Sequence, residues 1–188
     1  NEITDQSFYA MAEKKTNPSI KLLGLGEGSV EINEGLIVKT DRLSILTSID
    51  QLAKLSNDDI LLLNGEWAKD NDVELLEANI LPLLDRGIPI VVAGKTMEFL
   101  RESMGESESS FSTIVSAYVR DPQDGTSYEY SYNIPSDAAQ SGALESGVQL
   151  AVTWSEDLLA HMQAASLAES SDIRTTSSDA QWILTTQK

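Results

Sequence analysis

Residues 58–94 read DDILLLNGEWAKDNDVELLEANILPLLDRGIPIVVAG, and this stretch decides the fold. Two apolar runs, at 60–63 and 88–93, flank an amphipathic segment at 73–84. Runs that are continuously apolar, without alternation, are typical of strands in a parallel sheet that is covered on both faces. The stretch therefore predicts a β-α-β unit, and the crossover between its strands is right-handed by default.

The segment between the two runs has the pattern of a helix with one buried stripe. The apolar residues that recur at helical spacing are Val73, Leu76, Ile80, Leu83 and Leu84. Asp72 is the predicted N-cap, and Gly87 is the predicted stop. Pro82 removes a backbone donor inside the helix at a cost of about 3 kcal/mol, so we expect a bend or break near Asn79.

The carboxyl ends of these two strands are the predicted place for a ligand, because ligands of open α/β sheets gather there. The residues at these ends are Asn64, Gly65, Glu66 and Trp67 after the first strand, and Gly94, Lys95 and Thr96 after the second. The Gly94-Lys95-Thr96 run is not a phosphate-binding P-loop. Pro89 stands where that motif needs its first glycine, and the residues between are strand. A lysine in such a loop is more often a solvated charge than a contact to a ligand, and we expect the same of Lys95.

The same stretch resembles the core of type 1 glutamine amidotransferase-like domains. There an apolar strand ends in a glycine turn, and a helix with an ending like LLDRG leads into a strand like VVAG. The resemblance implies a Rossmann-like fold. Enzymes of that family use a cysteine nucleophile, and this chain has no cysteine. The resemblance therefore implies the fold without the glutaminase chemistry.

Composition bounds the class of protein. The chain has 188 residues, 41% of them hydrophobic and 23% charged, which is ordinary for a globular domain with a sizeable core. We expect a tether or short helix at 1–18 and a single α/β domain at 19–188. The net charge of −17 repels polyanions, so nucleic acid is not a predicted partner. No apolar run approaches the length of about 18 residues that membrane insertion needs.

Thiol chemistry is excluded by the absence of cysteine, which also favours an extracytoplasmic over a cytosolic location. Because the chain begins at Asn1, we expect that a preceding segment has been removed. His161 is the only histidine, and its place beside an apolar stripe indicates a surface residue. Asp70 to Asp72 begins like a calcium loop, but Leu75 stands where that loop needs glycine. We predict no metal and no cofactor.

The other predicted elements follow in chain order. Strands are expected at 20–25, 43–47 and 181–186, and helices at 5–15, 48–56 and 96–104, with Ser48 and Thr96 as the caps of the last two. Residues 24–29 are glycine-rich, but 30–38 alternate like a strand, which favours a turn or hairpin over a dinucleotide loop. We further expect a short helix from Ser136 to Glu145, a break at Gly147, a strand at 148–154 and a helix at 155–169.

A hairpin at 112–120 and 126–134 carries four of the five tyrosines. Tyr128, Tyr130 and Tyr132 share one face by alternation, and Tyr118 is expected to join them across the ladder. The simpler interpretation is that these rings half-cover the sheet with their hydroxyl groups in water. The alternative is a contact surface for a partner protein or a sugar.

These patterns predict an α/β fold with a parallel or mixed central sheet, helices on both faces and an appended antiparallel hairpin. The function that they favour is a non-catalytic binding or protein-interaction module. The alternative is a hydrolase or small-ligand-binding enzyme of amidotransferase-like fold, with its site at the strand carboxyl ends and with Glu66 and Lys95 in use.

Overall fold

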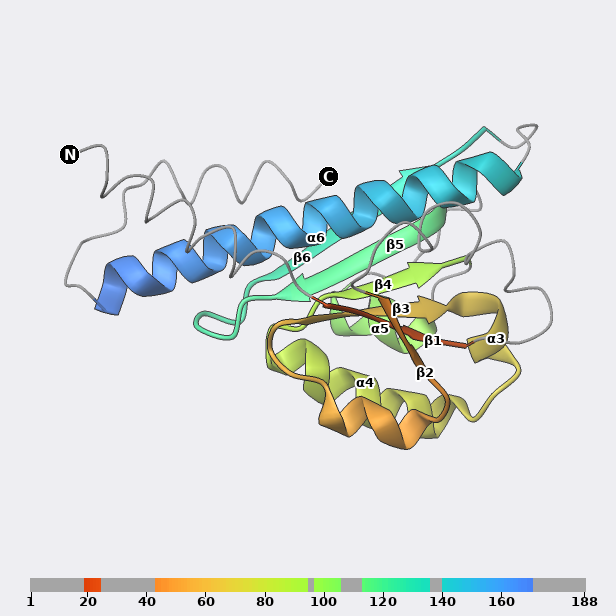
Figure 1. Cartoon of the computed structure of the whole chain (residues 1–188), viewed down its shortest axis with the longest axis horizontal. Coiled ribbons are helices and arrows are strands. Elements are labelled where there is room, and N and C mark those ends of the chain that lie inside the picture. Colours follow the sequence, from red (N-terminus) through yellow and green to blue (C-terminus); the bar gives the residue numbers. More distant parts are fainter. Residues whose placement is uncertain (1–18, 25–42, 95–96, 106–112, 136–139, 171–188) are drawn as a thin grey trace.

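The computed structural model describes residues 19–24, 43–94, 97–105, 113–135 and 140–170. Its centre is a six-stranded sheet in the order β2-β1-β3-β4-β5-β6 (Figure 1). The strands are β1 (Ser19–Leu23), β2 (Leu43–Leu46), β3 (Asp59–Asn64), β4 (Ile90–Ala93), β5 (Thr113–Arg120) and β6 (Ser127–Asn133). β1 to β4 are parallel, and β5 and β6 are added in antiparallel pairing. The predicted α/β class with a mixed sheet is confirmed.

The predicted β-α-β unit is present as β3, α4 (Val73–Asp85) and β4, with β3 and β4 paired in parallel. The Asp72 carboxylate accepts a hydrogen bond from the Leu75 N–H at 3.1 Å, which confirms the N-cap. Gly87 follows the helix with a φ of +82°, as a C-terminal glycine does.

Of the bend or break predicted near Asn79, the break is wrong, because α4 runs without interruption through Pro82, and the bend stays a prediction. Four large apolar side chains of this helix are buried, namely Leu76, Ile80, Leu83 and Leu84. Each contributes roughly 1.5–3 kcal/mol when fully buried. Their sum exceeds the cost of about 3 kcal/mol for the lost hydrogen bond at an internal proline.

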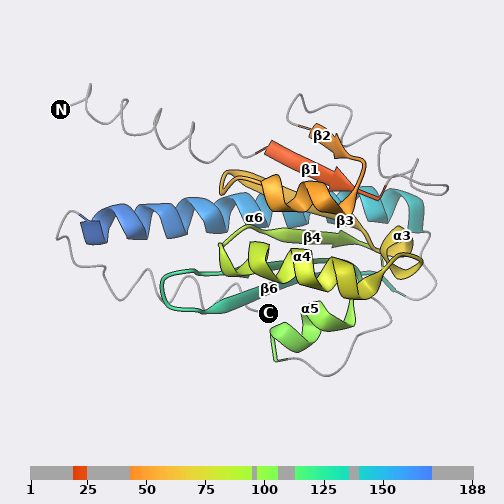
Figure 2. The same cartoon turned by 90° about the horizontal axis from the view of Figure 1, so that it is seen from below.

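Helices cover both faces of the sheet (Figure 2). The long helix α6 (Gln140–Ser170) lies across one face, over β4, β5 and β6. The other face carries α4, the 3-10 helix η2 (Ile49–Lys54) and α5 (Glu98–Ser103), while α3 (Gly65–Lys69) follows the end of β3. Each face has its own apolar core, and β3 contributes Ile60 and Leu62 to one and Leu61 and Leu63 to the other. This sharing explains the continuously apolar pattern of β3.

The predicted break at Gly147 and strand at 148–154 are wrong, because α6 continues through both as one helix of 31 residues. Val148, Leu150, Val152 and Trp154 alternate in sequence, but burial follows the helical spacing instead. The buried residues of α6 are Gly147, Val148, Ala151, Val152, Ser155, Leu158, Leu159 and Met162. Leu150 is 49% exposed. The helix predicted at 155–169 is present as the second half of α6, and Leu158, Leu159 and Met162 of this part are buried.

Three smaller predictions also need correction. Ser48 precedes η2 but makes no side-chain capping bond. The N-cap of α5 is Met97, so the predicted cap at Thr96 is wrong. The hairpin is confirmed as β5 and β6, but Tyr118 pairs with Glu129 and lies in the core on the opposite face from Tyr128, Tyr130 and Tyr132. The reason is the register, in which even-numbered residues of β5 oppose odd-numbered residues of β6.

Several predicted segments lie outside the described residues. These are the tether and helix within 1–18, the turn or hairpin within 25–42, residues 136–139 and the closing strand at 181–186. In the part of the chain that is described, no helix is both long enough and apolar enough to cross a membrane.

Candidate functional site

Asn64 organises the carboxyl end of the parallel strands. Its Oδ1 accepts hydrogen bonds from the backbone N–H groups of Glu66 at 3.2 Å and Trp67 at 3.4 Å, which starts α3. Its Nδ2 donates to the Gly24 carbonyl oxygen at 2.9 Å. Since Gly24 directly follows β1, this one buried side chain ties the ends of β1 and β3 together.

Trp67 occupies the space above the end of β1. Gly24 has a φ of +103°, and a Cβ atom added there would lie 2.9 Å from both Asn64 Cβ and Trp67 Cε3. The indole ring therefore packs against the backbone of Gly24, which only glycine permits at this distance and backbone angle. The side chains of Asn64 and Trp67 therefore occupy the space at the carboxyl ends of β1 and β3.

Glu66 lies beside the turn after β4. Gly94 in that turn has a φ of +94°, and an added Cβ atom would lie 3.5 Å from Glu66 Cγ. The Glu66 side chain is exposed and forms an ion pair with Lys69 at 3.0 Å. The structure thus brings Asn64, Gly65, Glu66, Trp67 and Gly94 together, as the strand pattern predicts. Lys95 and Thr96, the other two predicted ligand-binding residues, lie outside the described residues.

The three tyrosines of β6 lie under α6. Tyr128 is buried at 3% exposure, whereas Tyr130 and Tyr132 are half-buried. The Tyr130 and Trp154 rings are tilted by 32° with their centroids 5.7 Å apart. Loss of solvent raises the pKa of Tyr128 above 10.0, and the nearby carboxylates of Asp124 and Asp121 raise it further against a hydrogen bond with Thr126.

Burial also raises the pKa of Tyr130, and the neighbouring Tyr132 adds to that effect. Tyr130, Tyr132 and Trp154 leave part of their surface exposed where α6 crosses β6, and Leu150 lies one helical turn before Trp154. We refer to these four residues as the aromatic surface.

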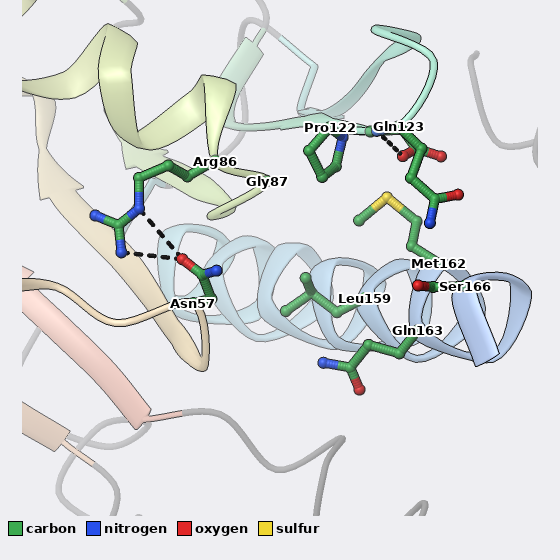
Figure 3. A pocket seen from close by; sticks show the side chains of 10 residues that line it. Asn57, Arg86, Gly87, Pro122, Gln123, Leu159, Met162, Gln163 and Ser166 are labelled. Carbon is green, nitrogen blue, oxygen red and sulfur yellow. Dashed lines mark hydrogen bonds between the residues drawn. The ribbon is translucent and has the colours of Figure 1, made fainter. Parts of the chain in front are cut away.

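A cavity of about 270 Å³ lies at the opposite end of the parallel strands, where sequence patterns predict no site (Figure 3). Its walls come from the segments just before β3 and β4, from the β5–β6 turn and from α6. The lining residues are Asn57, Arg86, Gly87, Asp121, Pro122, Gln123, Leu159, Met162, Gln163 and Ser166. The lining residues come from turns and from one face of a helix, and such a combination leaves no common pattern in the sequence. The one available signal is the inward stripe of α6 with Leu159 and Met162.

Arg86 closes one end of this cavity together with Asn57. The guanidinium Nε and Nη2 donate to Asn57 Oδ1 at 3.2 and 2.9 Å, and Nη2 also donates to the Leu55 carbonyl oxygen at 2.7 Å. All of these acceptors are neutral. The side chain is therefore held in place with its positive charge uncompensated by them.

Among the described residues, no group of three or more histidine, cysteine, aspartate or glutamate side chains is placed to hold a metal ion. His161 is partly buried on α6. Comparison of the chain with protein-family models, with curated proteins and with solved structures gave no match.

Proposed function

We propose that this domain is a non-catalytic interaction module that acts outside the cytoplasm and binds a partner protein through the aromatic surface. The observation that carries the proposal is the half-buried Tyr130–Trp154 pair beside Leu150, which is 49% exposed. Tyrosine and tryptophan are enriched at protein interfaces, where they supply large contact areas at low entropic cost. The lack of cysteine supports the location.

The use of the strand-end residues supports a non-catalytic role. The Asn64 side-chain amide caps α3 through its oxygen and donates to the Gly24 carbonyl oxygen through its nitrogen, and Trp67 packs against Gly24. Glu66 is paired with Lys69. These side chains act on their own fold, whereas a catalytic site needs groups aimed at a bound substrate. With a net charge of −17, the chain favours a partner whose rim is basic.

A site-specific photo-crosslinker tests this proposal. Placed at Leu150 in the native host, it should give an adduct with one defined protein, and the same probe at Glu77 on the exposed side of α4 should not. The adduct should disappear in Trp154→Ala and persist in Glu74→Ala. A dissociation constant measured with the purified partner should then rise by about tenfold or more in Trp154→Ala, as for a residue at the centre of an interface. Equal adducts at both probes, or an unchanged dissociation constant, would overturn the proposal.

The alternative proposal is a hydrolase or small-ligand-binding enzyme of amidotransferase-like fold. Its support is the convergence of Glu66, Gly94 and Asn64 at the carboxyl ends of β3 and β4, where such folds bind ligands. Chromogenic ester and amide substrates test it. Turnover by the wild-type chain that is lost in Glu66→Gln and kept in Glu74→Gln would favour the enzyme over the interaction module.

A further inference from the structure

We propose that Asn64 is a deamidation site, at which the folded domain blocks the reaction and an opening of the carboxyl ends of β1 and β3 permits it. The product carries a carboxylate in place of the Asn64 amide, so that a transient opening becomes a permanent loss of stability. This inference concerns a covalent modification and does not rest on the proposed function.

The sequence at Asn64 is the first observation. Asn64 is followed by Gly65, and no other asparagine of the chain precedes a glycine. Asparagine deamidates when the backbone nitrogen of the next residue attacks the carbonyl carbon of the asparagine side chain. Glycine obstructs this attack least, because it has no Cβ atom and its backbone rotates freely. In the unfolded chain, Asn64 is therefore the asparagine that we expect to react first.

The reaction consumes water and releases ammonia. The Gly65 nitrogen forms a bond to Asn64 Cγ and gives up its proton, while the bond between Cγ and Nδ2 breaks, so that ammonia leaves and a cyclic imide remains. Water then adds to one of the two carbonyl carbons of the imide. Cleavage of the bond between the nitrogen and Cγ leaves an aspartate. Cleavage of the bond between the nitrogen and the backbone carbonyl carbon leaves an isoaspartate, in which the chain runs through Cβ.

The backbone of folded Asn64 keeps the reacting atoms apart. The imide ring contains Cα, Cβ, Cγ and the carbonyl carbon of Asn64 together with the Gly65 nitrogen, so Cβ and that nitrogen must lie on the same side of the bond between Cα and the carbonyl carbon. Asn64 has a φ of −76° and a ψ of 105°, an extended conformation that turns the Gly65 nitrogen away from Cβ. Ring closure therefore requires a rotation that breaks the pairing of Asn64 with Ala93.

The side chain of Asn64 is held as firmly as its backbone. It is 4% exposed, and its Oδ1 accepts hydrogen bonds from the backbone N–H groups of Glu66 at 3.2 Å and Trp67 at 3.4 Å. Its Nδ2, the atom that leaves as ammonia, donates to the Gly24 carbonyl oxygen at 2.9 Å. The Trp67 ring packs against Gly24 and covers this end of the strands. The carboxamide cannot turn toward the Gly65 nitrogen until these contacts open.

Deamidation prevents the same contacts from forming again. A carboxylate has no hydrogen to donate to the Gly24 carbonyl oxygen, and it places a negative charge beside that oxygen in a buried position. A buried charge without its partner destabilises the folded chain. An isoaspartate also lengthens the backbone between β3 and α3. Deamidated molecules are therefore less stable than the molecules from which they form.

Mass spectrometry of the peptide that carries Asn64 tests the inference on the full chain. At neutral pH, the folded chain should lose the Asn64 amide about tenfold or more slowly than the chain unfolded in urea, because the reaction depends on an opening. Urea below the unfolding transition should accelerate the loss. In the unfolded chain, Gly65→Ala should slow it, since the added Cβ atom obstructs the attack. Equal rates in the folded and unfolded chains would overturn the inference, and so would an Asn64 that does not react in the unfolded chain.

Variants and the modified protein locate the opening. Trp67→Ala removes the ring that covers Gly24 and should raise the rate in the folded chain by about tenfold or more, whereas Lys69→Ala on the exposed side of α3 should leave it unchanged. Circular dichroism shows whether each variant is folded, and the urea series on the wild-type chain tests the same opening without a substitution. Folded Trp67→Ala that reacts at the wild-type rate would overturn the inference.

The deamidated fraction of the wild-type chain provides the last measurement. Anion-exchange chromatography separates it by its added negative charge, and urea denaturation should then show a lower midpoint for this fraction than for the unmodified one. Equal midpoints would overturn the inference that the modification makes the loss of stability permanent.

Discussion

Gly147 of α6 lies directly against the ring of Tyr132 in β6. A Cβ atom added to Gly147 would lie 2.6 Å from Tyr132 Cδ1 and 2.8 Å from Val115 Cγ2. A glycine inside a helix normally destabilises it by roughly 0.5–1 kcal/mol relative to alanine. Here the missing side chain lets α6 approach the β5–β6 hairpin, so Gly147 serves packing and does not end the helix.

We predict that Gly147→Ala destabilises the domain by about 1–3 kcal/mol, the usual cost of an extra methyl group in a packed contact. The matched control is Gly142→Ala on the same helix, because an added Cβ atom there meets nothing within 4 Å. Gly142→Ala should stabilise the domain by up to about 1 kcal/mol through helix propensity. Urea denaturation gives both values. Equal stabilisation by the two variants would mean that α6 does not rest on Tyr132 in this way.

The second prediction concerns the two roles of Asn64. Asn64→Asp keeps an acceptor for the N–H groups of Glu66 and Trp67, but it loses the donor to the Gly24 carbonyl and adds a charge beside it. Asn64→Ala loses both roles. We expect either substitution to cost about 2 kcal/mol or more, since a buried group is left without its partner.

The control for Asn64 is Asp72→Ala, which removes the exposed N-cap of α4 and should cost about 1 kcal/mol. The measurement is the free energy of unfolding in urea. If Asn64→Asp proved as stable as wild type, the hydrogen bond to Gly24 would not be what joins the ends of β1 and β3.

The fold was predictable where local patterns and tertiary packing agree. In β3 and β4 the apolar runs are buried on both faces, and Asp72 and Gly87 bound α4 as their chemistry predicts. In α6 two patterns coexist. Residues 148–154 alternate as a strand does, yet Val148, Ala151 and Val152 also fit a helix, and only the sheet surface beneath them selects the helix.

The candidate sites were predictable to a smaller extent. The meeting of Asn64, Glu66 and Gly94 follows from parallel strand order, which residues 58–94 already indicate. The cavity of Arg86 and Gln163 was not predictable, because these residues are 77 positions apart in the sequence (163 minus 86) and approach only through the packing of α6. The side of the sheet on which Tyr118 lies was also not predictable, because it depends on the register that pairs Tyr118 with Glu129.

The third prediction is a loss of stability at alkaline pH. Burial raises the pKa of Tyr128 and of Tyr130 above 10.0 in the folded chain, so the fold favours their neutral phenols. This contribution is fully present below the unfolded pKa of about 10 and is lost as pH rises through the folded pKa values. The free energy of unfolding should therefore fall between about pH 10 and pH 12, and ultraviolet titration should show late ionisation that decreases in Tyr128→Phe and Tyr130→Phe. Ionisation of both residues at the ordinary pH would contradict this.

The fourth prediction concerns Arg120, which joins three elements at the end of β5. Its Nη1 donates to the carboxylate of Asp85, the last residue of α4, at 2.6 Å, and its Nη2 donates to the Ser103 carbonyl oxygen of α5 at 2.8 Å. Its Nε donates to Ser127 Oγ in β6 at 3.1 Å. Hydrogen bonds to charged groups contribute about 1.5–3 kcal/mol each, although shared contacts do not add fully.

We therefore expect Arg120→Ala to lower the free energy of unfolding by about 2–4 kcal/mol. Arg120→Lys should recover only part of this loss, since an ammonium group cannot reproduce the planar fork that reaches α4, α5 and β6 together. Lys69→Ala is the matched control, because it removes the exposed pair with Glu66 and should cost about 1 kcal/mol or less. Urea denaturation at low and high salt separates the two cases, since screening weakens the exposed pair more than the partly buried one. Equal losses for Arg120→Ala and Lys69→Ala would show that Arg120 is an ordinary surface charge and that apolar packing alone holds the three elements together.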